Sequence, residues 1–220
     1  MIDIVISETL KARCPNIAIG SIQGEIKVAP SDQQLINLLD NACTEFAQKY
    51  TVEDISQLKP ISDSRKAYKS LGKDPARYRL SSEALLRRIV KDKGIYKINN
   101  IVDINNLLSI TSFYSICAFD VSKLSPPIKF TIGTKQDEYY GIGRGLLNIE
   151  NLPVFEDQLG KFGSPTSDSE RVKITNETNH ISMNIISFGG NSELQNYLQQ
   201  LKEYLEMFAS AQNIEIKIII

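Results

Sequence analysis

Residues 77–94, RYRLSSEALLRRIVKDKG, are the most heavily charged passage of this 220-residue chain. Four aliphatic residues in it recur at helical spacing: Leu85, Leu86, Ile89 and Val90. This spacing predicts an amphipathic helix whose aliphatic side faces a core. Ser81 or Ser82 is expected to cap its start, and Gly94 to end it. Three basic side chains then lie on its outer side or flank: Arg87, Arg88 and Lys91.

Basic residues are concentrated around this helix. Between Arg65 and Lys97 the chain has eleven Lys or Arg and three Asp or Glu, whereas the whole chain has 25 basic and 26 acidic residues. Three tyrosines are interleaved with them: Tyr68, Tyr78 and Tyr96. Because cations neutralise phosphates and aromatic faces stack on unpaired bases, the run indicates a phosphate-rich partner such as RNA. A solvated helix face, or a helix end that uses cations for its dipole, would give the same pattern.

Strands and helices alternate irregularly on both sides of this passage. Apolar runs predict strands near 2–6, 16–22, 126–133, 138–143, 180–188 and 214–220, the last of them buried in its sheet. Helical spacing predicts helices within 31–50, 98–110 and 191–208, the second entered through Asp103 and Asn105. Residues 61–79 are expected to be a connector broken by Gly72 and Pro75, and 152–178 a turn-rich segment. Without regular strand–helix–strand units, the class expected is α+β.

Several classes of protein do not fit the sequence. No apolar stretch approaches the roughly 18–20 residues that span a bilayer, and the first residues have no basic-then-apolar leader. Three cysteines, Cys14, Cys43 and Cys117, include no CxxC pair, which argues against a disulfide framework or a zinc site and favours a reducing cytoplasm. No metal or cofactor is indicated, since HExxH, Walker-lysine and GxSxG motifs are missing.

Individual candidate residues have alternative interpretations. The glycines of GIGRG, residues 141–145, fit a strand-end turn better than a phosphate loop. A structural role is favoured for His180, the one histidine, and a buried inert thiol for Cys117. The segment SPTSDSER, residues 164–171, offers hydroxyls, a carboxylate and a guanidinium. These groups can converge on a polar ligand, or can bond the loop's own backbone.

Four stretches in order carry a family resemblance: RYRLSSEALLRRI, INNIVDINNLLSI, AFDVSKL and GSPTSDSERVKIT. Together they resemble the B3/4 domain, the tRNA-editing module of the phenylalanyl-tRNA synthetase beta subunit, and more closely the stand-alone proteins built around it. The resemblance covers residues 60–190, and the flanks are expected to complete a single domain of residues 1–220. It implies an α+β fold with sandwiched mixed sheets and peripheral helices.

The resemblance also implies a function. In the synthetase this module hydrolyses the ester of tRNA wrongly charged with tyrosine, in a pocket between the sheets. The present chain is therefore expected to bind the acceptor end of an aminoacylated tRNA and to deacylate it in trans, without a ligation core of its own. Two departures favour, as an alternative, a non-catalytic module that binds RNA or an amino-acid-like ligand. Cys117 stands where the synthetase commonly has a histidine, and Asn184 stands near an acidic position. A small-molecule hydrolase or ligand-binding protein is a third reading.

Residue roles follow from the same resemblance. The pocket is expected to contain five residues: Cys117, Asn184, Gly163, Ser167 and Arg171. Thr166, Ser167 and Ser169 would donate hydrogen bonds, while Asp168 would orient water, bind the substrate's ammonium, or pin its loop to Arg171. An activated ester requires neither a metal nor a protein nucleophile, because positioning and oxyanion stabilisation can suffice. Four cations would hold tRNA phosphates: Arg79, Arg87, Arg88 and Lys91. The stretches 79–83 and 166–169 are expected to converge at the site.

Overall fold

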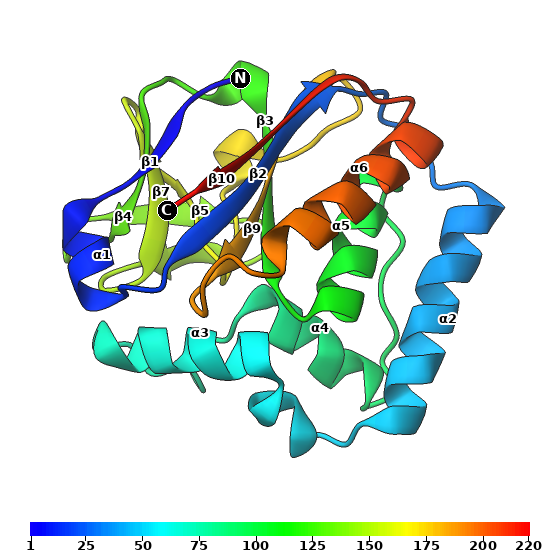
Figure 1. Cartoon of the computed structure of the whole chain (residues 1–220), viewed down its shortest axis with the longest axis horizontal. Helices are drawn as coiled ribbons and strands as arrows, with labels where there is room; N and C mark the ends of the chain where they lie inside the picture. The colour runs from blue at the N-terminus through cyan, green and yellow to red at the C-terminus, as the bar shows by residue number, and fades with distance from the viewer.

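The computed structural model describes all residues, 1–220. Two four-stranded sheets and a separate two-stranded hairpin combine with six α-helices and three short 3₁₀ turns. Figure 1 shows the second sheet and the helical layer on opposite sides of the central sheet. This arrangement confirms the α+β class predicted from the sequence. No helix has the length and apolar character needed to cross a bilayer.

The central sheet is antiparallel throughout. Its strand order is β10 (Gln212–Ile219), β2 (Ala18–Glu25), β9 (His180–Ser187) and β3 (Ser115–Asp120). The two central strands, β2 and β9, are almost entirely buried, because one face meets helices and the other meets the second sheet. β3 and β10 are the edge strands, and β10 is largely exposed rather than buried within the sheet as predicted.

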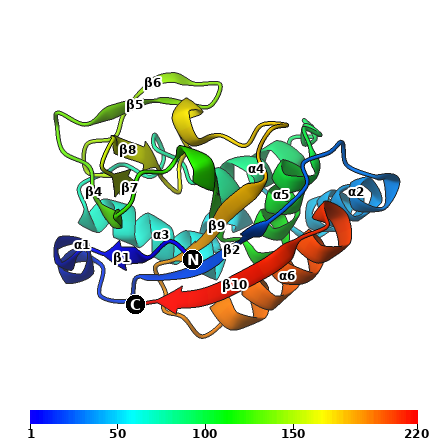
Figure 2. The same ribbon diagram turned by 90° about the horizontal axis from the view of Figure 1, so that it is seen from above.

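The second sheet packs across the first and is mixed. Its order is β1 (Ile4–Ile6), β4 (Ile128–Ile132), β7 (Pro153–Asp157) and β8 (Gly160–Gly163), with β1 parallel to β4. The hairpin consists of β5 (Glu138–Gly141) and β6 (Gly145–Asn148), so residues 141–145 form the strand-end turn predicted for GIGRG. Figure 2 shows this hairpin standing beyond the second sheet.

The helices enclose the other side and one end of the central sheet. Their bounds are α1 Glu8–Arg13, α2 Gln33–Lys49, α3 Lys59–Ser70, α4 Ser81–Ile89, α5 Asn100–Ser112 and α6 Leu194–Ala209; the 3₁₀ turns are Asp54–Gln57, Val121–Lys123 and Glu170–Val172. α5 and α6 cover the central sheet, and α2 packs outside α5. Gly20 allows this approach, because a Cβ there would lie 3.1 Å from Cδ1 of Leu198 on α6.

The two predicted long helices outside the charged passage form as expected. The carboxylate of Asp32 accepts a hydrogen bond from the backbone N–H of Leu35 at 2.8 Å and so caps α2. In α6 the periodic leucines at 194, 198, 201 and 205 are all buried. In both cases a 3.6-residue apolar period is satisfied by packing on one side only.

Other element boundaries differ from the predictions. Residues 59–70 form α3 rather than a connector, because Pro60 starts the helix and Ile61 and Tyr68 bury its inner face; Gly72 and Pro75 follow the helix end. α1 was not foreseen, although Ser7 caps it by accepting from the Leu10 N–H at 3.2 Å. It is too short to show an apolar period.

The caps near the charged passage also differ. Leu80 is the N-cap of α4, whereas Ser81 is already helical and the Ser82 hydroxyl lies 3.2 Å from the Ser115 hydroxyl. The helix ends at Ile89, before Gly94. α5 starts at residue 100 with its cap at 99, because the Asp103 carboxylate instead accepts from the Ser31 hydroxyl at 2.6 Å. The predicted entry at 103–105 is therefore wrong by one turn.

Candidate functional site

A row of polar side chains crosses the central sheet on the face toward the second sheet. Ser21, Asn184 and Cys117 are cross-strand partners on β2, β9 and β3, and each is at most 1% exposed. Directly paired residues point to the same side of a sheet. Phe119, two residues after Cys117 on that side, packs against Phe162 of the second sheet with ring centroids 4.9 Å apart. We call residues 21, 184 and 117 the polar row.

The loop after β8 brings a carboxyl group to the end of this row. Because β3 is an edge strand, its Ala118 N–H is free to donate to Oδ2 of Asp168, at 3.1 Å. Residue 168 as a whole is half-buried, but its Oδ1 is enclosed and has no hydrogen-bond partner. Burial raises the pKa of Asp168 to about 7, despite the opposing effects of the Ala118 N–H and the Cys117 thiol. Burial and the Asp168 charge also raise the pKa of Cys117 well above its ordinary value.

Two buried tyrosines fix the loop from other elements. The hydroxyl of Tyr68, on α3, lies 3.0 Å from the Thr166 hydroxyl. The hydroxyl of Tyr139, on β5, donates to the carbonyl of Ser167 at 2.6 Å and approaches the Ser164 hydroxyl at 3.0 Å. Burial raises the pKa of both phenols, so both stay protonated near neutral pH. Loop 163–169 is thus held in a defined position beside the polar row.

Unpaired polar atoms are concentrated in this region. Of the six buried side-chain N or O atoms without a hydrogen-bond partner, four belong to the polar row or the loop: Ser21 Oγ, Asn184 Oδ1, Asp168 Oδ1 and Ser169 Oγ. Each unpaired buried group costs about 1–3 kcal/mol, which makes such a concentration unusual for a purely structural core. These four atoms themselves are closed to solvent in this structure.

The remaining predicted pocket residues have structural contacts. Gly163 permits close packing, because a Cβ there would lie 2.6 Å from the Phe119 ring and 3.0 Å from Asp168 Oδ1. Arg171 forms a two-point ion pair with buried Asp157, at 2.9 and 3.0 Å. The suggestion that Asp168 pins its loop to Arg171 is therefore wrong.

Residues 65–97, which we call the basic passage, enclose a buried carboxylate. Glu83, whose side chain is 1% exposed, accepts from Nη1 of Arg65 at 3.0 Å and from Nε of Arg87 at 2.9 Å, and Nε of Arg79 lies at 3.8 Å. We call these four residues the Glu83 cluster. Arg88 lies over the Tyr96 ring at 4.7 Å, and Lys91 is exposed. The charge run therefore has an internal role in addition to any at the surface.

The tyrosines of this passage differ in their surroundings. Tyr68 is fully buried, so its predicted role in stacking bases is wrong. The Lys73 ammonium lies 3.8 Å above the Tyr78 ring, whereas Tyr96 is 70% exposed. Of the three, Tyr96 is the most exposed, although Arg88 lies over its ring.

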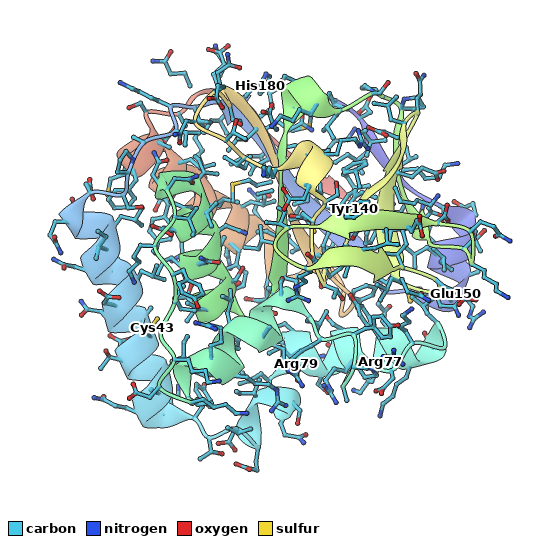
Figure 3. The ribbon with its side chains drawn as sticks, turned by 180° about the vertical axis from the view of Figure 1, so that it is seen from behind. Cys43, Arg77, Arg79, Tyr140, Glu150 and His180 are labelled. Atoms are coloured by element: carbon cyan, nitrogen blue, oxygen red, sulfur yellow. The ribbon has the colours of Figure 1, made fainter.

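The start of α4 meets the loop, as expected for stretches 79–83 and 166–169. The backbone N–H of Ser81 donates to the carbonyl of Pro165 at 2.8 Å. Figure 3 shows the β5–β6 hairpin in front of the sheets with Tyr140 on it, and Arg77 and Arg79 on the connection below it. The loop thus lies between the hairpin and the basic passage.

Comparison with known proteins decides the family. The B3/4 domain family matches residues 63–199. This chain belongs to the B3/4 family. A solved structure similar to it is an N-terminal fragment of the phenylalanyl-tRNA synthetase beta subunit from Pyrococcus horikoshii, with 13% identity and a TM-score of 0.46, covering 98% of this chain and 50% of that one. This chain thus spans about half the length of that structure. No curated protein matches it.

The B3/4 segment contains most, but not all, of the site. It includes loop 163–169, β3 and β9, whereas Ser21 lies on β2, outside the match. The sequence alone did not identify Ser21, Tyr68 or Tyr139 as site residues. The available signal was a serine within the otherwise apolar strand at 16–22; the tyrosines gave none. No group of three or more His, Cys, Asp or Glu is placed to hold a metal ion.

Proposed function

We propose that this B3/4 protein binds tRNA and hydrolyses the ester of a wrongly acylated tRNA in trans. The observation that carries the proposal is the enclosed, unpartnered Oδ1 of Asp168 beside the buried polar row. Membership of the B3/4 family supplies the reaction class, through the editing module that the sequence motifs resemble. The structure adds an enclosed carboxyl group, Asp168, whose pKa burial raises to about 7.

Asp168 is the proposed general base. A carboxyl with a pKa of about 7 is half-ionised at neutral pH, which is where a general base works best. In this mechanism Oδ1 takes a proton from a water that attacks the ester carbonyl. The tetrahedral intermediate then collapses as the same carboxyl gives that proton to the departing ribose oxygen, which breaks the ester bond. If the Tyr68 hydroxyl donates to Thr166, the Thr166 proton is free to stabilise the oxyanion. The amide of Asn184 then faces the aminoacyl side chain.

Substrate access in this mechanism requires the β5–β6 hairpin to move. The hairpin covers the loop through the Ile142 N–H, which donates to the carbonyl of Asp168 at 3.0 Å, and through Tyr139. It belongs to neither four-stranded sheet, so it can separate without breaking either ladder. Glycines at 143 and 145, both with positive φ, form its turn.

We also propose that residues 1–220 act as one B3/4-type domain. Support comes from the flanks: β2 and β10 lie outside residues 63–199, yet β2 pairs along the full length of β9. A single cluster of 49 buried apolar residues includes positions from Ile4 to Ile219. A cytoplasmic location, expected from the cysteine usage, belongs to the same proposal.

Deacylation of a panel of misacylated tRNAs tests the enzymatic proposal. We expect at least one tRNA to release its amino acid above background, and Asp168→Asn to lower kcat roughly a hundredfold or more, because an amide cannot accept the proton. Glu45→Gln is the matched control, since it removes one carboxylate from an exposed part of α2. No release from any tRNA would remove the enzymatic claim.

A non-catalytic binding module is the second candidate. Cys117, which stands where the synthetase commonly has a histidine, favours it, because its raised pKa leaves a neutral thiol at that place. This candidate predicts that a non-hydrolysable aminoacyl-adenosine analogue binds and that no misacylated tRNA is turned over. Measured turnover abolished by Asp168→Asn would exclude it.

The exposed cations after α4 provide the test of tRNA binding. Lys91 and Lys93 are exposed and lie outside the Glu83 cluster. We expect Lys91→Glu with Lys93→Glu to weaken tRNA binding and to reduce the slope of log affinity against log salt by about one to two, since each lost phosphate contact contributes roughly 0.9. Lys129→Glu with Lys135→Glu, exposed positions on the other side of the fold, is the matched control. An unchanged salt slope would contradict binding through this surface.

A further inference from the structure

The outer edge of β10 is a long strand edge with no partner. β10 pairs with β2 on one side, and its other side ends the central sheet. Figure 2 shows it at the rim of the molecule, above α6. Its eight residues contain no proline, and its one register irregularity lies before Glu215. Unpaired edges of this length and regularity are ready templates for another strand.

The side chains of β10 alternate in a way that is self-complementary. Glu215 and Lys217 are largely exposed and lie on the face toward the second sheet, where they pair with the N-terminal amine and with Asp3. The alternating isoleucines at 214, 216 and 218 are half-buried on the face toward α6. Charges and isoleucines therefore occupy opposite faces of one edge strand.

A second copy of the same strand fits one register. If two β10 strands pair antiparallel about a two-fold axis at Ile216, Glu215 of each copy lies opposite Lys217 of the other, and Ile214 lies opposite Ile218. An axis at 215 or 217 instead places two glutamates or two lysines directly opposite, which is destabilising. Charge complementarity thus selects both the partner and the register.

We propose that the chain forms a symmetric dimer through β10, in which the two central sheets join into one sheet of eight strands. The two-fold axis is perpendicular to the sheet, so both helical layers lie on one side and both second sheets on the other. The interface is isologous, as in most homodimers. It lies on the opposite edge of the central sheet from β3, which bonds to Asp168, so the candidate sites remain separate.

Charge reversal at the two positions tests this dimer. We expect sedimentation equilibrium between about 1 and 100 µM, which detects micromolar dissociation constants, to show a mass approaching twice that of the chain. With Lys217→Glu, Glu215 of each copy would lie opposite a glutamate at position 217 of the other copy, on both sides of the axis. The dissociation constant is therefore expected to rise roughly tenfold or more. The double exchange Glu215→Lys with Lys217→Glu restores opposite charges and should restore the dimer.

Two controls separate the interface from other effects of the substitutions. Lys135→Glu makes the same charge change at an exposed site away from β10 and should leave the dissociation constant unchanged. Asp3→Asn removes the intramolecular partner of Lys217 without changing the strand and should also leave the dimer intact. A monomer at every concentration, or a double exchange that fails to recover the dimer while circular dichroism shows it folded, would overturn the proposal.

Discussion

Glu83→Gln is expected to lower the free energy of unfolding by about 3–5 kcal/mol, the range for breaking a buried ion pair from one side. The side chain of Glu83 is 1% exposed and contacts guanidinium groups from α3, from the connection before α4, and from α4 itself. Glutamine keeps the shape but leaves three cations close together without their counter-charge. The effect should therefore exceed that of removing any single arginine.

Urea unfolding of three variants measures this difference. Glu45→Gln, on an exposed part of α2, is the matched control and should change stability by less than about 0.5 kcal/mol. Arg87→Met should cost less than Glu83→Gln, because Arg65 still holds the carboxylate. A Glu83→Gln protein as stable as wild type would mean that the cluster is neutralised in some other way.

The second large expected effect is a pH dependence that Asp168→Asn removes. The pKa of Asp168 is about 7 in the folded protein, against an ordinary value of 3.8, so the folded state binds this proton more tightly. Stability from this group is fully present below about pH 4 and is lost as the pH rises toward 7. Asparagine resembles the protonated form. At pH 8 the variant is thus expected to be more stable than wild type by about 2–4 kcal/mol, the lower figure allowing for partial solvent access.

The measurement is the difference between the two unfolding free energies from pH 4 to pH 8. Other groups that titrate in this range cancel in the difference because both proteins contain them. The difference should be near zero at pH 4 and grow until about pH 7. A flat difference would show that the carboxyl is not held in an environment that disfavours its charge.

Much of the fold could be predicted from the sequence because its longest elements have a clear period. The leucines of α6 and the apolar face of α2 each repeat at helical spacing, and both helices form with their inner faces buried. α3 could not be predicted in this way, since its inner face is only a few residues wide and is interrupted by charges. One of its four buried residues, Ser64, donates its hydroxyl to the Pro60 carbonyl at 2.7 Å, a contact with no sequence signature.

The candidate site was predictable only where its residues adjoin in sequence. Thr166 and Asp168 come from one short polar loop, and the stretch SPTSDSER, residues 164–171, indicated both. Tyr68 was misread as a surface aromatic because its partner, Thr166, is 98 residues away along the chain. The role of Ser21 depends on strand order, which places it beside Asn184 and which a single sequence does not reveal.

The Glu83 cluster has a consequence for the size of any polyanion that this protein can hold. The single carboxylate of the cluster offsets one of its three guanidinium charges and orients all three side chains inward, and Lys73 is bound by the Asn148 side chain and the Glu150 carbonyl. The remaining exposed cations of the passage lie in two parts of the chain, Lys66, Lys69 and Arg77 before α4 and Lys91 and Lys93 after it, whereas Lys97 pairs with Asp40. An anion that contacts both parts must reach past α4, whose nine residues are about 13 Å long, so simultaneous engagement of both favours an extended backbone.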